Sequence, residues 1–187
     1  RRLEPFDLVW IEEPLDCYDA EGHAELVRLF DEQPHDFILH ASPGELDRLD
    51  RFVHRTFNGM DLRHFVLGLR HLYRTYGGIE QAFLSPPDAP VSSALSADHT
   101  PTDLATMIAR FRSRFFEPAH QARTGKHVAD PARGSNAKRI NMYLRWMVRS
   151  ADRGVDMGHW QRIKPAELHV PLDVHTGRVA RELGLLR

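Results

Sequence analysis

Apolar residues recur at helical spacing along most of this chain, whereas the strict alternation typical of strands is rare. The clearest example lies over residues 61–76, where one helical face collects Leu62, Phe65, Val66, Leu69, Leu72 and Tyr73. Positions three and four apart lie on the same side of an α-helix, so this pattern predicts an amphipathic helix with a buried face. Gly77-Gly78 follows and suits the left-handed conformation that ends many helices. The sequence as a whole predicts an all-α fold with low sheet content.

The same spacing predicts further helices and their ends. We expect them over residues 20–32, after Ser42-Pro43, over 101–116, over 136–151 and over 174–183. Ser42, Ser135 and Asp173 stand at N-cap positions, where a side-chain oxygen accepts a hydrogen bond from an unpaired helical N–H. Pro34 is expected to end the first helix. The helix over 136–151 is predicted to bury its apolar side and to expose Lys138, Asn141, Arg145 and Arg149.

Polar and proline-rich segments divide the chain into regions. Residues 85–100 hold Pro86, Pro87 and Pro90 among serines and alanines, a composition typical of an exposed loop. We therefore predict an irregular start over 1–20, an acidic-to-neutral helical lobe over 21–84, a loop over 85–100 and a basic helical lobe over 101–187.

Charge is distributed unevenly along the chain, although the net charge is only −1. Residues 1–50 hold 4 Lys/Arg against 14 Asp/Glu, a net of −10, whereas residues 101–187 hold 16 against 8, a net of +8. A basic region of this kind favours binding to a polyanion such as nucleic acid. Attraction between the acidic and basic ends is the alternative explanation, and charge alone does not choose between them.

Composition excludes several classes of protein. With 187 residues and 42% hydrophobic content, the chain is long enough to build a core. No run of apolar residues reaches the ~18–20 that a membrane span needs, and the start lacks the apolar centre of a signal peptide, so the sequence predicts a cytoplasmic protein without membrane contact. The single cysteine, Cys17, excludes an internal disulfide and a four-thiolate metal site. The 12 histidines show no recognised ligand spacing, and we predict neither a metal nor a cofactor.

One helix start carries candidate chemistry. Gly134-Ser135-Asn136 forms a turn of small residues before Lys138, and helix N-termini offer unpaired N–H groups that bind phosphate. The Lys138 amine is a nucleophile of the kind that forms Schiff bases at a sugar C1′. An ordinary surface lysine at a helix start is the alternative reading of the same residue. Trp146 and Trp160 could stack on an extruded base, although helical tryptophans more often belong to a core.

The C-terminal segment resembles a known signature. Asp173 precedes Val174-His175-Thr176-Gly177-Arg178-Val179-Ala180, and Leu183-Gly184-Leu185 follows. This order and spacing resemble the helix-hairpin-helix DNA glycosylase superfamily. In that superfamily a lysine on the first turn after the hairpin attacks the anomeric carbon, and an aspartate stabilises positive charge at the sugar while the base departs. The resemblance implies these roles for Lys138 and Asp173. A charged N-cap is the structural alternative for Asp173.

A longer resemblance extends along the chain. It covers Asp36-Phe37-Ile38, residues 52–59, residues 134–149, Gly154-Val155-Asp156 and residues 171–186. These segments resemble a bacterial domain-of-unknown-function family that is related to the glycosylases and nearest in layout to archaeal 8-oxoguanine DNA glycosylase. The resemblance implies a helix-hairpin-helix glycosylase-like helical domain, which need not be complete at either end.

These observations predict a base-excision DNA glycosylase, with or without lyase activity, acting on duplex DNA that contains a damaged base such as 8-oxoguanine. The predicted catalytic residues are Lys138 and Asp173, and the predicted DNA-binding residues are Gly134, Ser135, Asn136, Arg139, Arg145, Arg149 and His175. A non-catalytic DNA-binding or interaction module with a degenerate glycosylase fold is the alternative, and a purely structural helical domain is a third hypothesis. The lesion and the oligomeric state are left open.

Overall fold

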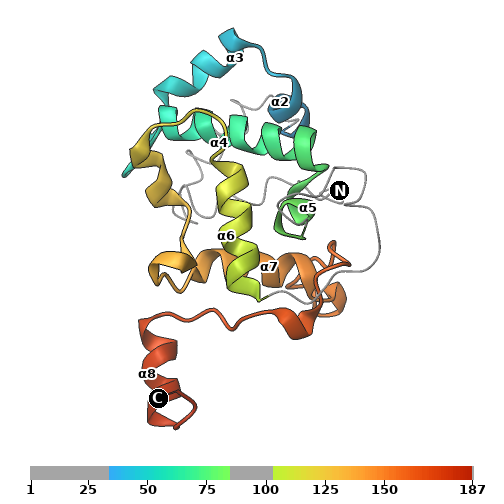
Figure 1. Cartoon of the computed structure of the whole chain (residues 1–187), viewed down its shortest axis with the longest axis vertical. Helices are drawn as coiled ribbons and strands as arrows, with labels where there is room; N and C mark the ends of the chain where they lie inside the picture. The colour runs from blue at the N-terminus through green and yellow to red at the C-terminus, as the bar shows by residue number, and fades with distance from the viewer. Residues whose placement is uncertain (1–33, 85–102, 187) are drawn as a thin grey trace. The chain divides into compact units, whose positions relative to one another are not determined.

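The structure, a computed structural model, describes residues 34–84 and 103–186 (Figure 1). The predicted irregular start, the helix over 20–32 and the loop over 85–100 lie outside the described residues. The α-helices are α2 (Pro34–His40), α3 (Pro43–Asp47), α4 (Gly59–His71), α5 (Ile79–Leu84), α6 (Leu104–Phe115), α7 (Lys138–Val148) and α8 (Val174–Glu182). Two short antiparallel strands, β1 (Val53–His54) and β2 (Phe57–Asn58), pair with each other. The described chain is therefore mostly helical, as the apolar spacing predicts.

Shorter helical turns connect these elements. Five are 3₁₀ turns, over Arg48–Arg51, Ala122–His127, Pro131–Arg133, Ala151–Arg153 and Pro165–Glu167. A π-helical turn over Leu72–Tyr76 extends α4, and Gly77 ends it in the left-handed conformation at φ 79°. The predicted end of this helix is thus confirmed, and its start lies two residues earlier, at Gly59.

The chain forms two compact units, each built from segments that are distant in sequence. Within the described residues, the first unit contains 34–82 together with 113–128, and the second contains 83–84 and 103–112 together with 129–186. The divisions fall within α5 and α6, so a single break along the chain does not separate the units.

The first unit is organised around α4, the longest of its helices. Asn58 caps α4 by accepting a hydrogen bond from the Asp61 N–H, and the Asp61 carboxylate accepts from the Asn58 N–H in return. The predicted apolar face is buried: Leu62, Phe65, Val66, Leu69 and Leu72 are each at most 5% exposed. Gly68 lets Phe115 approach this helix, because a Cβ at that position would lie 2.8 Å from the Phe115 ring. The hydrophobic spacing therefore predicted the buried face of α4 and its π turn correctly, except that Tyr73 is only half-buried.

Arginines of α4 and of its π turn hold the short helix α2 in place. Arg70 donates hydrogen bonds to the carbonyls of Ile38 and Ala41 at 2.5 and 2.9 Å, and Arg74 donates to the carbonyl of Leu39. The last carbonyls of a helix lack intrahelical partners, so these bonds complete α2. Pro34 begins α2, so the described structure gives it the role of a helix start, which suits a residue whose φ is fixed and which lacks an N–H.

Ser42 caps α3 as predicted. Its hydroxyl accepts from the Glu45 N–H, and the Glu45 carboxylate accepts from the Ser42 N–H at 2.7 Å, with Pro43 at the first helical position. This capping box compensates for the small length of α3.

The second unit packs aromatic side chains between α5, α6, α7 and the chain after α7. The Phe83 and Phe111 rings stack with centroids 4.4 Å apart, and Trp160 contacts both Phe83 and Tyr143. Trp160 is 7% exposed, so it belongs to the core and is not available as a platform for an extruded base. Arg110 of α6 donates to the carbonyls of Phe83 and Leu84 at the end of α5.

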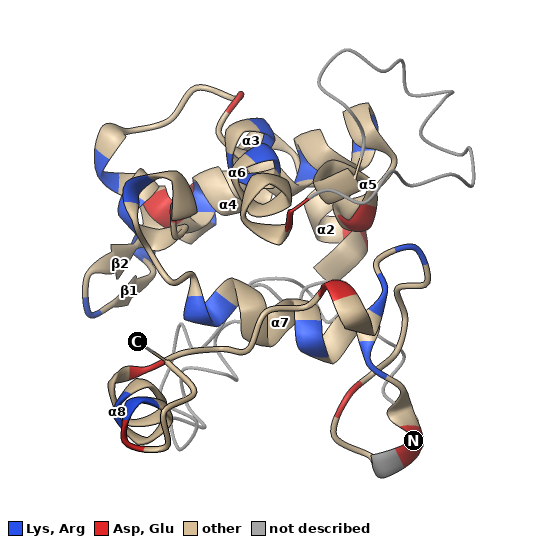
Figure 2. Ribbon diagram, turned by 60° about the horizontal axis from the view of Figure 1, so that its bottom comes forward, with Lys and Arg blue, Asp and Glu red and all other residues tan. Residues whose placement is uncertain are grey.

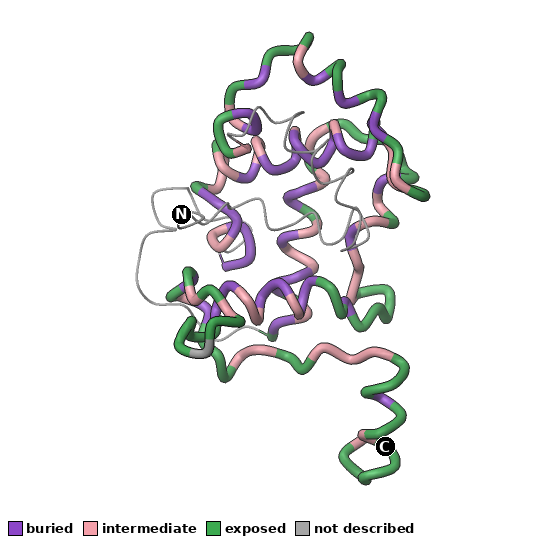
Figure 3. Tube along the Cα trace, turned by 180° about the vertical axis from the view of Figure 1, so that it is seen from behind, coloured by how far each residue is buried: buried purple, intermediate pink, exposed green. Residues whose placement is uncertain are grey.

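The C-terminal helix α8 differs from every other long helix because it is almost wholly exposed (Figure 3). Of its residues only Gly177 is buried, whereas Val174 is 85% and Val179 is 47% exposed. The predicted N-cap is confirmed, since the Asp173 carboxylate accepts a hydrogen bond from the Thr176 N–H at 2.7 Å. Gly184 follows the helix at a φ of 69°, as its position after the last helical turn predicts.

Candidate active site

The starts of α7 and α8 bring Lys138 and Asp173 together. Lys138 is the first residue of α7, and Asp173 is the N-cap of α8. The Lys138 Nζ donates a hydrogen bond to the Asp173 Oδ2 at 3.2 Å, although the two residues lie 35 positions apart in sequence. The side chains are 49% and 35% exposed, so a solvent-borne substrate can reach both groups. The two residues that the sequence singled out as a catalytic pair are therefore neighbours.

The Asp173 carboxylate is held in its ionised form. Its hydrogen bond from the backbone N–H of Thr176 lowers its pKa from 3.8 to about 2, and the hydrogen bond from Lys138 adds to this effect. Asp173 is consequently an anion at any physiological pH. It can stabilise a positive charge beside it, but it is too weak a base to accept protons readily.

The turn before α7 differs from the predicted one. The helix begins at Lys138, not at Asn136, and its N-cap residue is Ala137, in the left-handed conformation at φ 43° and ψ 40°. Ser135 does not cap the helix, because its hydroxyl accepts from the Ala137 N–H at 3.2 Å, two residues along, within the turn. The predicted cap at Ser135 is therefore wrong.

Asn141 explains why the helix starts late. Its Nδ2 donates to the carbonyl of Asn136 at 3.0 Å, so the side chain takes the acceptor that a backbone N–H would use if the helix began there. The first helical bond runs from the Asn141 N–H to the Ala137 carbonyl at 2.9 Å. Asn141 is 4% exposed, which corrects its predicted place on the solvent side of the helix.

Helix α7 also ends earlier than predicted, at Val148, because N–H groups of the following loop take the hydrogen bonds of its last carbonyls. The N–H groups of Met157 and Gly158 donate to the Trp146 carbonyl, and that of Trp160 donates to the Met147 carbonyl. These bonds satisfy carbonyls in the last turn, and Arg149 already has an extended backbone. Ala151, predicted to be buried, is exposed.

Two of the predicted DNA-binding arginines share one carboxylate. Asp156, whose side chain is 7% exposed, lies 3.4 Å from the Arg145 Nε and 3.5 Å from the Arg149 Nε. This carboxylate neutralises part of their charge and fixes their direction. Arg139, at the other end of α7, is exposed, and Figure 2 shows basic residues at both ends of this helix.

The remaining predicted site residues lie on the surface. Gly134, Ser135 and Asn136 are exposed, and Gly134 has a left-handed φ of 79° after the 3₁₀ turn over Pro131–Arg133. His175 is exposed in the first turn of α8. Of these residues, the turn 134–136 is closest in sequence to Lys138, and His175 follows Asp173 by two positions.

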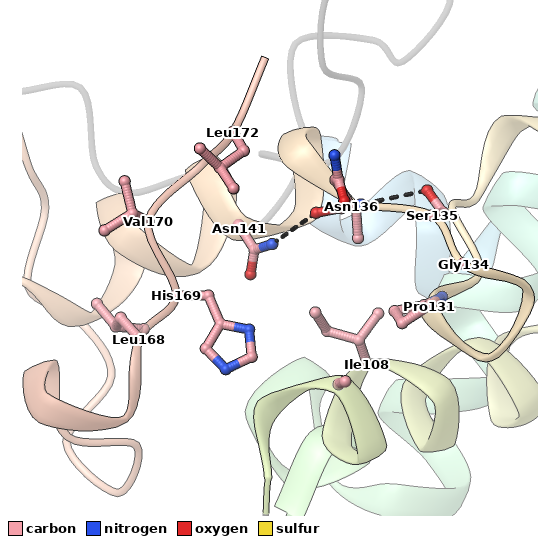
Figure 4. A pocket seen from close by; sticks show the side chains of 12 residues that line it. Ile108, Pro131, Gly134, Ser135, Asn136, Asn141, Leu168, His169, Val170 and Leu172 are labelled. Atoms are coloured by element: carbon pink, nitrogen blue, oxygen red, sulfur yellow. Dashed lines mark hydrogen bonds between the residues drawn. The ribbon is translucent and has the colours of Figure 1, made fainter. Parts of the chain in front are cut away.

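A pocket of about 580 Å³ opens within the second unit, beside the candidate pair (Figure 4). Asn136 and Ala137, which immediately precede Lys138, line it, and so does Leu172, which immediately precedes Asp173. Leu168, Val170 and Ile108 provide apolar wall, and Asn141 and His169 provide polar groups. The sequence did not predict this pocket, because its walls come from segments that are distant in sequence, including α6, α7 and the extended segment before α8.

Other kinds of site have no support within the described residues. Among residues 34–84 and 103–186, no group of three or more His, Cys, Asp or Glu side chains is arranged to hold a metal ion. No helix in the same part of the chain is both long and apolar enough to cross a membrane.

Comparison with known proteins decides the family. The family model described as "Protein of unknown function (DUF2400)" matches residues 21–187. The chain belongs to the DUF2400 family. The match includes Lys138, Asp173 and every residue of the pocket. It does not by itself link the DUF2400 family to helix-hairpin-helix glycosylases.

A second, much shorter similarity concerns a different protein. Over 31 residues the chain is 61% identical to L-talarate/galactarate dehydratase of Salmonella typhimurium strain LT2. This stretch covers 17% of the DUF2400 chain and only 8% of the dehydratase, so it carries no argument about the activity of this chain. No solved structure matches the chain.

Proposed function

We propose that this DUF2400 chain is a base-excision DNA glycosylase with an associated lyase step, acting on duplex DNA that contains a damaged base such as 8-oxoguanine. The observation that carries the proposal is the 3.2 Å contact between the Lys138 amine and the Asp173 carboxylate. The superfamily that these residues resemble uses a lysine and an aspartate at the corresponding places. The resemblance selected these two residues from positions 35 apart in sequence, and they are hydrogen-bonded neighbours.

The proposed chemistry assigns a separate role to each residue. The Lys138 ammonium, which donates to Asp173, first gives up a proton to solvent. The free amine then attacks C1′ of the nucleotide, the C1′–N bond breaks, and the base leaves with the electron pair of that bond and takes up a proton. Positive charge develops at the sugar during this step, and the ionised Asp173 beside Lys138 is placed to stabilise it. With a pKa of about 2, Asp173 acts through its charge and not as a general acid.

The lyase step follows from the covalent intermediate. Attack by Lys138 leaves an amine bound to C1′ of a closed sugar ring. The C1′–O4′ bond then opens, O4′ keeps the electron pair and takes up the proton that the amine gives up, and a protonated Schiff base forms at C1′, which makes a C2′ hydrogen acidic. Loss of that proton drives elimination of the 3′ phosphate and cuts the strand, and water then hydrolyses the Schiff base to free the lysine. Every bond that forms or breaks lies between the DNA, Lys138 and water, so no cofactor is required.

The surroundings of Lys138 suit a phosphate backbone. The turn 134–136 is exposed and precedes the N-terminus of α7, where unpaired N–H groups and the helix dipole favour an anion. Arg139 is exposed next to Lys138. We assign backbone contacts to these residues, and a weaker contribution to Arg145 and Arg149, because Asp156 already compensates their charge.

Borohydride trapping tests the proposal. Full-length protein is incubated with duplexes that carry 8-oxoguanine, uracil or an abasic site, and borohydride reduces any Schiff base to a stable adduct. We expect an adduct with at least the abasic duplex, and none with Lys138→Arg. Arginine keeps the positive charge beside Asp173 but is not a nucleophile at neutral pH, so this variant isolates the amine from the ion pair.

The alternative function gives a different result in the same experiment. A non-catalytic DNA-binding module would bind duplex DNA in a salt-sensitive manner, form no adduct with any of the three duplexes, and bind equally well after Lys138→Gln and Asp173→Asn. That combination of results would reject the glycosylase proposal and support the binding module.

A further inference from the structure

The pocket beside the candidate pair contains a buried polar atom without a partner. The Asn141 Oδ1 has no hydrogen-bond partner among the described residues, although the residue is only 4% exposed. The orientation of this amide is fixed, because its Nδ2 donates to the Asn136 carbonyl. Figure 4 shows the Oδ1 turned away from Asn136 and toward the space between His169 and Ile108. A buried acceptor without a partner destabilises the fold, and a ligand that donates a hydrogen bond to it would recover that free energy.

The remaining walls restrict the kind of ligand. Leu168, Val170, Leu172 and Ile108 present apolar surface around the polar atom. A flat, largely apolar ring with an N–H at its edge matches this combination, and a nucleobase is a ring of that kind. The pocket volume of about 580 Å³ is ample for one base.

The position of the pocket relates it to the reacting bond. Its wall includes the residues directly before Lys138 and directly before Asp173, although neither of those two residues lines it. The proposed glycosylase function requires the sugar of a base in the pocket to reach both groups. Extrusion of a nucleotide from the duplex delivers a base and a sugar in this relative arrangement.

We propose that this pocket receives the extruded base and that Asn141 selects bases that present a ring N–H, by accepting that hydrogen bond at Oδ1. This inference rests on the proposed glycosylase function for its substrate. Asn141 then has two roles, since its Nδ2 holds the turn before Lys138 and its Oδ1 reads the base. A base that offers only an acceptor at this edge would leave two acceptors facing each other and would be rejected.

A pair of matched substitutions separates the two roles. Asn141→Leu and Asn141→Asp both remove the Nδ2 donor, but only aspartate keeps an oxygen acceptor. The measured quantity is the rate of base release from an 8-oxoguanine or uracil duplex, divided by the rate of cleavage of an abasic duplex, which has no base to read. We expect this ratio to fall roughly tenfold or more in the leucine variant and to stay within about threefold of the wild-type value in the aspartate variant. Equal ratios in the two variants would overturn the role of Oδ1.

A second measurement does not depend on catalysis, and its first arm does not depend on the folding of an Asn141 variant. Lys138→Gln protein is titrated with duplexes that carry uracil or hypoxanthine, and with duplexes in which a methyl group replaces the ring N–H of the same base. We expect the methylated bases to bind roughly tenfold more weakly or worse, and Asn141→Leu in the same background to abolish the difference. Equal binding of each base and its methylated form would overturn the inference.

The two proposals fail in different ways. Absence of any Lys138 adduct removes the glycosylase chemistry but leaves the binding titration free to show a base pocket. Suppose instead that the Lys138 adduct forms, but that the two Asn141 variants have equal rate ratios and that each base binds as tightly as its methylated form. The glycosylase proposal then stands, and Asn141 has no role in base selection.

Discussion

Each unit contains an aspartate at the start of a helix, and the two residues have opposite surroundings. Asp61 lies in the first turn of α4 and its side chain is 0% exposed. Asp173 caps α8 and its side chain is 35% exposed. Both have a pKa below the ordinary value of 3.8, so both are anions in the folded protein.

The carboxylate oxygens of Asp61 already accept hydrogen bonds from neighbouring residues and cannot reach a substrate. Thr124 donates its hydroxyl at 2.7 Å, Arg123 donates from its guanidinium at 2.7 Å, and the Asn58 N–H donates as well. The His127 Nε2 lies 3.3 Å from the same carboxylate. Burial alone would raise the pKa of Asp61, but these hydrogen bonds and the charges of His127 and Arg123 outweigh it and lower the pKa. The result ties the segment 113–128 to α4.

Asp173 has fewer hydrogen-bond partners than Asp61, and its carboxylate is accessible to a substrate. It accepts from the Thr176 N–H and from the Lys138 amine and otherwise faces solvent. A saturated, buried carboxylate stabilises a fold, whereas an exposed one beside an amine remains able to act on a substrate. The comparison predicts that removing Asp61 damages stability and that removing Asp173 damages activity.

Asp61→Ala should give the largest loss of stability. It leaves the Thr124 hydroxyl and the Asn58 N–H without their acceptor and removes the counter-charge of Arg123, so we expect the free energy of unfolding to fall by about 3–5 kcal/mol. Urea denaturation followed by circular dichroism measures the change. A loss below about 1 kcal/mol would show that Asp61 contributes no more to the free energy of unfolding than the cap of an exposed helix does.

His64 should make the stability of the first unit depend on pH. Burial lowers its pKa from 6.5 to about 4, and the charge of His120 adds to this effect, while backbone groups and Asp61 oppose it. The stabilising neutral form is fully present above pH 6.5, and its contribution falls as pH drops toward 4. We expect a loss of about 3 kcal/mol over this range, because each pKa unit corresponds to about 1.4 kcal/mol.

The control for this pH effect is His64→Phe, which fills a similar space between Phe116 and Phe115 without a titrating group. Its free energy of unfolding should change much less between pH 6.5 and 4 than that of the wild type. The pKa of Asp61 lies below 3.8, so the midpoint of its titration falls outside this range. Parallel curves for the two proteins would assign the pH dependence to another group.

Substitutions at Asp173 should have a small effect on stability and a large one on activity. Asp173→Ala removes the cap of an exposed helix, at a cost of about 1 kcal/mol, whereas asparagine keeps a capping oxygen and should cost less than about 0.5 kcal/mol. Both should slow base release in single-turnover assays, because both remove the charge. Hydrogen exchange of the α8 amides measures the cap separately. An asparagine variant with wild-type activity would contradict the assigned role.

The smallest expected effect concerns the pKa of Asp173 itself. The Thr176 N–H is the main cause of its low pKa and Lys138 is the second. In Lys138→Gln, the pKa of Asp173 should therefore rise only part of the way from about 2 toward 3.8. Carbon-detected NMR titration of the carboxyl group gives this value. A return to 3.8 would mean that the cap contributes nothing.

The sequence predicted those features that depend on residues close together along the chain. The caps at Ser42 and Asp173 follow from a short polar side chain next to a helical run, and the buried face of α4 follows from apolar spacing. The start of α7 was predicted wrongly because the Asn141 amide competes for a backbone carbonyl, and composition cannot reveal that competition. Pro34 begins α2, whereas the helix that it was predicted to end lies outside the described residues.

By itself, the sequence determined the helical class, the main apolar faces, the position of the cap at Asp173 and the choice of Lys138 and Asp173 as a pair to examine. Tertiary structure decided what those residues contact. It brought together side chains 35 positions apart at the start of α7 and α8, surrounded Asp61 with partners more than 60 positions away, and turned Asn141 inward beside a pocket. The physical reason is that helix periodicity and capping act over a few residues, whereas burial and ion pairing depend on which distant segments pack together.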